Sequence, residues 1–147
     1  MDVFNEKKPI SGQSVPPHRA ELVGGRTIKS APSVRNFRVA QKLFDSISRQ
    51  LDLKEARVFL GERVFLDEQN CFVPDIAVVC DLDKIKEDGS HGVPDFVVEI
   101  LIPATEFLLR GSKRAAYEAA GVREFWIVDA HTKQVEIYKF EKHQQGQ

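Results

Sequence analysis

Residues 95–101 form an apolar segment that is interrupted only by two carboxylates, Asp95 and Glu99. Successive side chains of a β-strand point to opposite faces of the sheet. Asp95, Val97 and Glu99 therefore share one face of the expected strand. The other face is formed by Phe96, Val98 and Ile100. Because both faces are apolar apart from the two carboxylates, this pattern predicts a central strand.

Two longer stretches repeat apolar residues at helical spacing. In residues 34–51 an apolar stripe recurs every three to four positions, and Ser33 before it is a suitable N-cap. In residues 106–120 small apolar side chains form one face, with Thr105 and Gly121 as start and stop signals. A second face of this later helix carries Arg110, Lys113 and Tyr117, at spacing i, i+3 and i+7.

Shorter apolar runs predict strands around these helices. A hairpin over 21–29 is turned by Gly24-Gly25. The remaining strands are expected at 57–66, 71–80, 95–101, 124–128 and 135–140. This order of helices and strands indicates one α/β domain spanning 21–140. Residues 1–20 are expected to form a flexible arm, and residues 141–147 a disordered tail.

Composition narrows the class of protein. A chain of 147 residues with 42% hydrophobic and 29% charged residues fits one ordinary globular domain. No stretch approaches the run of about 18 apolar residues that spans a bilayer. The first residues also lack the apolar segment of a secretory signal. We therefore expect a cytoplasmic protein with no membrane partner.

The charge balance excludes a broadly basic nucleic-acid binder, since the net charge is −1. The charges are nevertheless unevenly distributed. Residues 19–63 contain ten Lys or Arg against five Asp or Glu, whereas residues 67–99 contain two against nine. Such halves could hold a phosphate backbone beside a cation site. A mixed solvated surface explains the bias equally well.

The acidic residues of the central strand suggest metal chemistry. Ionised carboxylates among apolar neighbours are costly unless they have a partner. Asp75 comes from the preceding strand and could join Asp95 and Glu99 around one cation. A set of carboxylate oxygens suits Mg²⁺ or Mn²⁺. That ion would support metal-assisted hydrolysis of a phosphodiester.

Each of these candidates also has a purely structural interpretation. Asp75 could form a turn, and Asp95 could cap the entry of its strand. Lys113 and Arg110 could belong to a solvated helix face. A mid-strand glutamate such as Glu99 nearly always needs a charged or metal partner. It is therefore the strongest single candidate for a site residue.

Several segments together resemble a known family. They are PDIAVV at 74–79, VPDFVVEIL at 93–101, K-x-x-x-Y at 113–117 and AGVREFWIVD at 120–129. A weaker part is ELVGGRTI at 21–28. In this order and spacing they resemble the Uma-two family, a branch of the PD-(D/E)xK restriction-endonuclease-like superfamily. The resemblance implies an α/β fold in which helices flank a mixed β-sheet.

The resemblance also implies a Mg²⁺- or Mn²⁺-dependent endonuclease that acts on nucleic acid, with DNA favoured by analogy. The matching positions give Asp75, Asp95 and Glu99 as catalytic metal ligands. Lys113 would orient the attacking water and stabilise the phosphate charge. Glu21 matches a further acidic position.

Tyr117 and Arg110 are supporting or phosphate-contact candidates on the helix that carries the lysine. Many proteins with this fold pair two sites across a dimer, so a homodimer is compatible with the resemblance.

Four positions depart from the family pattern. Ile102 and Ala104 replace serines of a Ser-Pro-Ser-Thr segment, Leu109 replaces an Asp, and Asn36 replaces a His. Loss of polar groups beside the expected site favours an alternative interpretation. In that alternative, a catalytically degenerate nuclease fold acts as a binding or assembly module.

Overall fold

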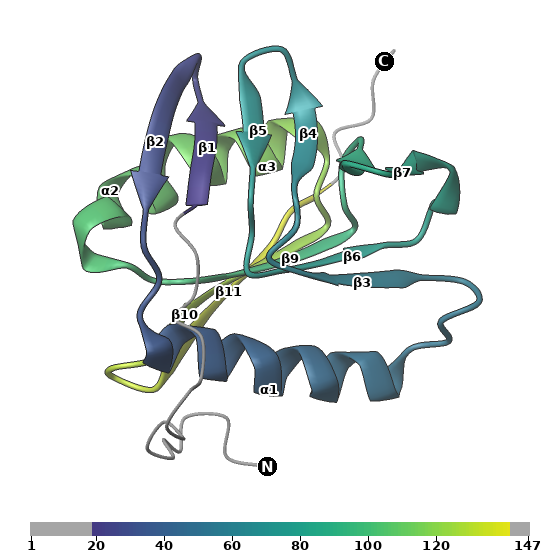
Figure 1. Cartoon of the computed structure of the whole chain (residues 1–147), viewed down its shortest axis with the longest axis horizontal. Helices are drawn as coiled ribbons and strands as arrows, with labels where there is room; N and C mark the ends of the chain where they lie inside the picture. Colours follow the sequence, from purple (N-terminus) through teal and green to yellow (C-terminus); the bar gives the residue numbers. More distant parts are fainter. Residues whose placement is uncertain (1–18, 142–147) are drawn as a thin grey trace.

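The structure is a computed structural model that describes residues 19–141. Within this range the strands form two mixed sheets (Figure 1). In spatial order, the six-stranded sheet contains β2 (Arg26–Ser30), β1 (Arg19–Val23), β5 (Asn70–Phe72), β4 (Val64–Asp67), β8 (Gly89–His91) and β7 (Ile85–Lys86). The five-stranded sheet contains β11 (Gln134–Lys139), β10 (Glu124–Asp129), β9 (Phe96–Ile100), β6 (Ile76–Val79) and β3 (Arg57–Leu60).

The helical segments follow the expected order. The long helix is α1 (Val34–Gln50), and the later helix consists of α2 (Glu106–Leu108), the π-helical turn η3 (Leu109–Lys113) and α3 (Arg114–Ala120). Two short 3-10 turns are η1 (Leu82–Lys84) and η2 (Pro103–Thr105). The α/β class with mixed sheets and flanking helices is confirmed.

Two expected strands are each divided between the sheets. The run 57–66 becomes β3 and β4, separated at Gly61, and the run 71–80 becomes β5 and β6, separated at Pro74. Gly61 has φ +62°, which ends extended backbone, and proline cannot donate a ladder hydrogen bond. The expectation of continuous strands here was wrong. The chain instead crosses from one sheet to the other on either side of the β4–β5 hairpin.

The six-stranded sheet includes two residues of the expected N-terminal arm. Strand β1 begins at Arg19, so Arg19 and Ala20 belong to the sheet and not to a flexible arm. The rest of the expected arm, 1–18, and positions 142–147 of the expected tail lie outside the described residues. No helix in the described range is long and apolar enough to cross a membrane.

One face of the five-stranded sheet is covered by α1. Figure 1 shows this helix lying along the sheet, and Val39 and Ala40 of α1 belong to one apolar cluster with Val98 and Ile100 of β9. Ser33 caps the helix as expected, because its hydroxyl accepts a hydrogen bond from the Asn36 backbone N–H. The even-numbered side chains of β9 therefore point toward α1, as the alternation predicted.

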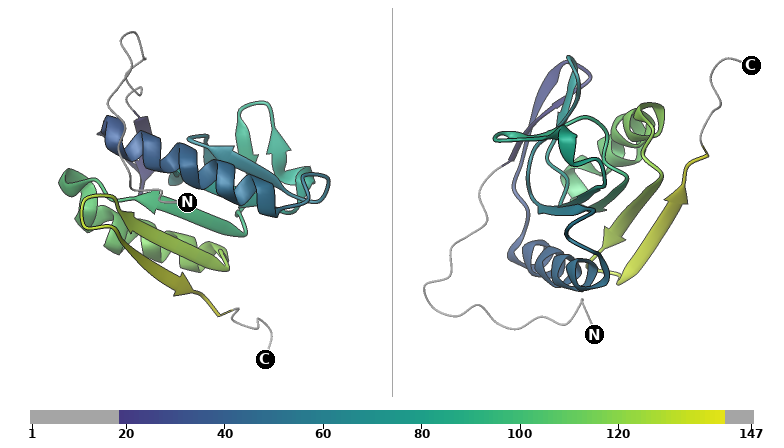
Figure 2. Two further views of the ribbon diagram at one scale, coloured as in Figure 1. Left: turned by 90° about the horizontal axis from the view of Figure 1, so that it is seen from below. Right: turned by 90° about the vertical axis from the view of Figure 1, so that its right-hand side faces the viewer.

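The opposite face of the same sheet packs against the later helix. Val97 of β9 lies in a second apolar cluster with Leu109, Tyr117 and Phe125. The six-stranded sheet contributes Val23 and Phe72 to this cluster. Figure 2 shows the same layers from two further directions. The odd-numbered face of β9, which carries Glu99, thus lies between the later helix and the second sheet.

Candidate active site at the junction of the two sheets

Glu99 and Asp75 are brought together by the pairing of β9 with β6. These strands are antiparallel, and Ile76 lies opposite Val98. Continuing the register by one residue places Asp75 opposite Glu99, on the face away from α1. The Ile100 backbone N–H donates a hydrogen bond of 2.7 Å to Asp75 Oδ2. Both acids are buried, with 3% of Asp75 and 6% of Glu99 exposed.

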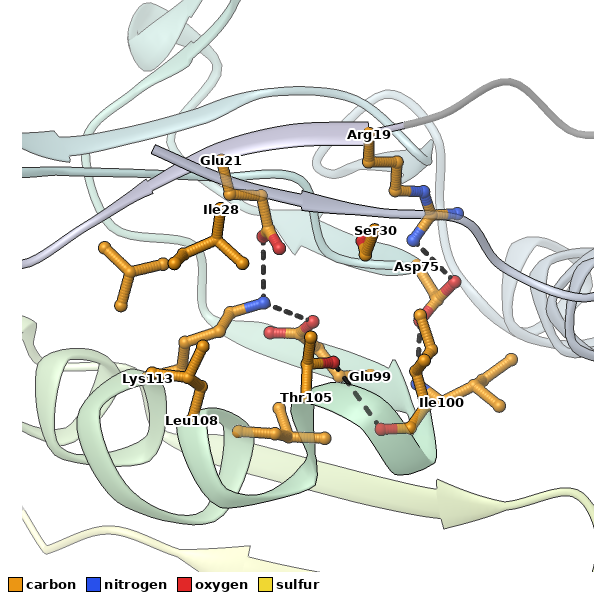
Figure 3. A pocket seen from close by; sticks show the side chains of 13 residues that line it. Arg19, Glu21, Ile28, Ser30, Asp75, Glu99, Ile100, Thr105, Leu108 and Lys113 are labelled. Carbon is orange, nitrogen blue, oxygen red and sulfur yellow. Dashed lines mark hydrogen bonds and ion pairs between the residues drawn. The ribbon is translucent and has the colours of Figure 1, made fainter. Parts of the chain in front are cut away.

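Lys113 reaches the acids from the later helix. Its Nζ donates to Glu99 Oε1 at 2.6 Å and to Glu21 Oε2 at 2.8 Å (Figure 3). The lysine ends the π-helical turn, and together with Leu109 it is buried. Single π-turns inside α-helices often accompany functional sites. The lysine therefore joins the later helix, β9 and β1 at one point.

Glu21 brings the six-stranded sheet to this point. It lies in the middle of β1, and its Oε2 also accepts a hydrogen bond of 2.8 Å from the Val73 backbone N–H. Arg19 lies two residues earlier, on the same face of β1. Its guanidinium donates to Asp75 Oδ1 at 2.8 Å (Figure 3).

Tyr117 supports the buried glutamate from one turn beyond the lysine. Its hydroxyl donates a hydrogen bond of 2.9 Å to Glu99 Oε2. Its ring is fully buried and packs edge-to-face on Phe72. The two oxygens of Glu99 are thereby held by two different donors, an ammonium and a phenol.

These contacts change the acidity of the buried groups. Burial raises the pKa of Glu99 to about 7, because desolvation of the carboxylate exceeds the opposing effect of the Lys113 ammonium. Burial disfavours the ammonium of Lys113, but Glu99 and Glu21 together outweigh it and raise the pKa of that lysine. Burial and the nearby Glu99 raise the pKa of Tyr117 well above its usual value. Lys113 and Tyr117 therefore stay protonated donors at neutral pH.

All five charged groups line one small pocket. Its space is about 30 Å³, enough for roughly two water molecules. The charged side chains that line it are Arg19, Glu21, Asp75, Glu99 and Lys113. Such a pocket can admit an ion but not a nucleotide.

Comparison with models of known protein families gives a match over most of the chain. The model of the Uma2 family, described as "Putative restriction endonuclease", matches residues 13–147. The chain belongs to this family. The sequence resemblance is therefore confirmed, together with its restriction-endonuclease-like class.

A solved structure supports the fold independently. It is the crystal structure of a putative nuclease belonging to DUF820 from Anabaena variabilis. The two share 23% sequence identity with a TM-score of 0.67, over 84% of this chain and 73% of the other. At this identity the likeness supports the fold alone. No curated protein gives a significant match to the chain.

Asp95 and Arg110 do not line this pocket. Asp95 lies immediately before β9, four residues from Glu99 and so roughly 13 Å along the strand. Its Oδ2 accepts a hydrogen bond from the Cys80 backbone N–H at 2.8 Å, which fixes the strand entry. Arg110 instead pairs with Glu106 and Glu136 at the surface. Five of the seven expected site residues therefore lie together in the structure. They are Asp75, Glu99, Lys113, Glu21 and Tyr117.

Three of the four departures from the family pattern, Leu109, Ile102 and Asn36, lie at the pocket or at the end of β9. Leu109 and Ile102 line the pocket, and Leu109 is 5% exposed. Asn36 is buried and donates its side-chain N–H to the Leu101 carbonyl at 3.1 Å, which ties α1 to the end of β9. The amide therefore has a structural role, whereas the leucine gives this Uma2 pocket an apolar wall.

The carboxylates of the pocket are candidate ligands for a metal ion. Among the residues that the structure describes, no group of three or more His, Cys, Asp or Glu side chains is arranged to hold a metal. Mg²⁺ is commonly held by one or two carboxylates, with water and substrate phosphate as its other ligands. Asp75 and Glu99, as neighbouring hard oxygen donors on one pocket, fit that mode of binding.

Sequence reasoning missed Arg19. The residue fell within the expected arm, and its partner Asp75 is 56 positions away. A signal was present, because Arg19, Glu21 and Val23 alternate along one strand. Extending the first strand by two residues would have placed Arg19 on the face that carries Glu21.

Proposed function

We propose that the chain is a metal-dependent endonuclease that hydrolyses phosphodiester bonds, with DNA as its substrate. The observation that carries the proposal is the buried contact of Lys113 with Glu99, beside Asp75 on the neighbouring strand. Buried charged groups that perturb one another in a pocket are typical of catalytic sites. Glu21 and Asp75 line the same pocket, which adds two carboxylates to this contact.

The charges of the pocket suit a phosphate. Three carboxylates and two cations line it, which leaves one net negative charge when all are ionised. A divalent ion reverses this to one net positive charge, which one phosphodiester neutralises. When bound by Asp75 and Glu99, such an ion would activate water and polarise the phosphoryl oxygen.

Lys113 would act on the charge that develops on the phosphate. Its ammonium is fixed by two carboxylates and stays protonated, so it serves as an electrostatic donor and not as a base. Tyr117 holds the second oxygen of Glu99 and so orients that carboxylate. Preorganised donors of this kind stabilise a transition state without reorganisation during the reaction.

A plasmid-nicking assay with Mg²⁺ or Mn²⁺ tests the proposal. The native chain should convert supercoiled DNA to the nicked form, and Glu99→Gln should not. Lys113→Ala should lower the rate by roughly 100- to 1,000-fold, as loss of one preorganised donor does. Glu118→Gln is the matched control, because it changes an exposed carboxylate of α3 in the same way and should cleave normally.

A second candidate is the catalytically degenerate module, and the apolar wall at Leu109 favours it. Leu109→Asp would place a carboxylate one turn before Lys113 and should raise cleavage if the native enzyme is merely weak. Absence of cleavage of DNA and RNA by both proteins would replace the endonuclease with the module. The homodimer stays a prediction of the resemblance.

A further inference from the structure

Asp75 already has a cation of the chain itself. Arg19 Nη1 lies 2.8 Å from Asp75 Oδ1, and their side chains are only 12% and 4% exposed. The same nitrogen lies 3.4 Å from the Val73 carbonyl oxygen, so the guanidinium is held between a carboxylate and a peptide group. This is a buried ion pair at the carboxylate that would bind metal.

Both carboxylate oxygens of Asp75 already accept a hydrogen bond, which leaves little capacity to bind a further cation. Its Oδ1 accepts from Arg19, and its Oδ2 accepts from the Ile100 backbone N–H. An ion in the pocket would face both the carboxylate and the guanidinium, since both line it. A positive charge within a few ångströms opposes a divalent cation strongly in a buried site.

We propose that Arg19 competes with the divalent ion for Asp75 and so sets the affinity of the site for metal. The inference rests on the proposed metal-dependent function and deepens it. Lys113 is held by two carboxylates, whereas Asp75 is the one carboxylate contact of Arg19 among the described residues. Arg19 is thus the cation that entry of metal at Asp75 would displace. The guanidinium so released would lie at the pocket, where a phosphate is expected.

Calorimetric titration of the full chain with Mn²⁺ tests this competition without relying on cleavage. Arg19→Gln removes the charge but keeps hydrogen-bonding capacity, and it should bind Mn²⁺ at least about tenfold more tightly than the native chain. Arg19→Lys keeps the charge and should remain near the native affinity. Arg57→Gln is the matched control, because Arg57 is exposed on the edge strand β3 and should change nothing. Adding Asp75→Asn to Arg19→Gln should abolish the gain.

Three outcomes of the titration distinguish this inference from the proposed function. Tighter binding by Arg19→Gln supports it, even when the native chain binds no measurable Mn²⁺. Equal binding by the native chain and Arg19→Gln overturns it, while Asp75-dependent binding and cleavage leave the endonuclease intact. No Mn²⁺ binding by either protein overturns both.

Nuclear magnetic resonance of the unmodified chain gives a check that needs no variant. The Arg19 Nε–H signal should shift as Mg²⁺ is added, and an unmoved signal with Mg²⁺ bound would contradict displacement.

Discussion

At the scale of single residues, Glu99 is a carboxylate that is buried away from water. It is 6% exposed, and both of its oxygens accept hydrogen bonds from within the chain. Its pKa of about 7 in the folded chain exceeds the usual value of 4.5. The folded state therefore binds a proton at Glu99 more tightly than the unfolded state does, which links stability to pH.

This linkage predicts the direction of a pH effect. The contribution of Glu99 is fully present below pH 4.5 and is lost as pH rises through about 7. A shift of this size corresponds to at most about 3 kcal/mol. In chelator, the unfolding free energy of the native chain should fall between pH 5 and pH 8, and Glu99→Gln should flatten that fall.

The control for this measurement is Glu136→Gln. The Arg110 hydrogen bond lowers the pKa of Glu136, so that group acts in the opposite direction and at acidic pH. Glu136→Gln should therefore keep the native fall between pH 5 and pH 8. An equal slope in the native chain and in Glu99→Gln would mean that Glu99 titrates as an exposed acid.

At the scale of elements, the later helix makes both an apolar and a charged contact with the five-stranded sheet. A small apolar face must lie on the sheet, while Lys113 must reach Glu99 on that same sheet. The π-helical turn at Leu109–Lys113 separates α2 from α3 between these contacts. Leu109 and Lys113, the first and last residues of this turn, are both buried.

Two glycines of this helix give a prediction about its backbone. Gly111 lies inside the π-turn without a left-handed φ, and a Cβ there would meet nothing within 4 Å. Gly111→Ala should stabilise the chain by about 0.4–1 kcal/mol, because alanine restricts the unfolded state more than glycine does.

Gly121→Ala is the matched substitution, since a Cβ there is also unobstructed but φ is +103°. It should destabilise by about 1 kcal/mol or more, because alanine is strained in that region. Urea denaturation measures both variants. Destabilisation by Gly111→Ala would show that the turn needs glycine.

The later helix shows which features of the fold can be predicted from local sequence patterns. Its span and its end at Gly121 were predicted from periodicity and a glycine stop signal, and the structure agrees. The π-turn was not predicted, because the apolar spacing of the sequence indicates only a regular helix. The division of 71–80 was missed although Pro74 lay within the run, which is itself a signal against a continuous central strand.

The same distinction applies to the site, because local patterns predict some of its residues and not others. Glu99 and Asp75 could be paired from the alternation of β9 and from the proline-aspartate motifs. Lys113 came from the family resemblance, since a helix lysine is ordinarily solvated. The Arg19–Asp75 contact could not be predicted, because it joins the two sheets and depends on where the chain crosses between them.

At the scale of the whole molecule, the charged residues of the pocket come from both sheets and from the later helix (Figure 3). Lys113 joins Glu21 of the six-stranded sheet to Glu99 of the five-stranded sheet. Arg19 on β1 likewise reaches Asp75, which precedes β6. Charged contacts therefore help to connect the two sheets.

Replacing the lysine tests how much this connection depends on charge. Lys113→Met keeps an apolar stem of similar length but leaves Glu21 and Glu99 buried without their ammonium. Removal of one partner from a buried ion pair typically costs about 3–5 kcal/mol. At pH 8 in chelator we expect a loss of this size in urea denaturation, and a smaller loss at pH 5, where Glu99 binds a proton.

The double variant Glu99→Gln/Lys113→Met should recover part of that loss, because it removes one of the two uncompensated carboxylates. Lys139→Met is the control, since Lys139 is exposed on β11 and its replacement should cost little. A loss below about 1 kcal/mol for Lys113→Met at pH 8 would contradict the prediction. It would mean that apolar packing alone holds the two sheets together, and that the buried charges are kept for chemistry and not for the fold.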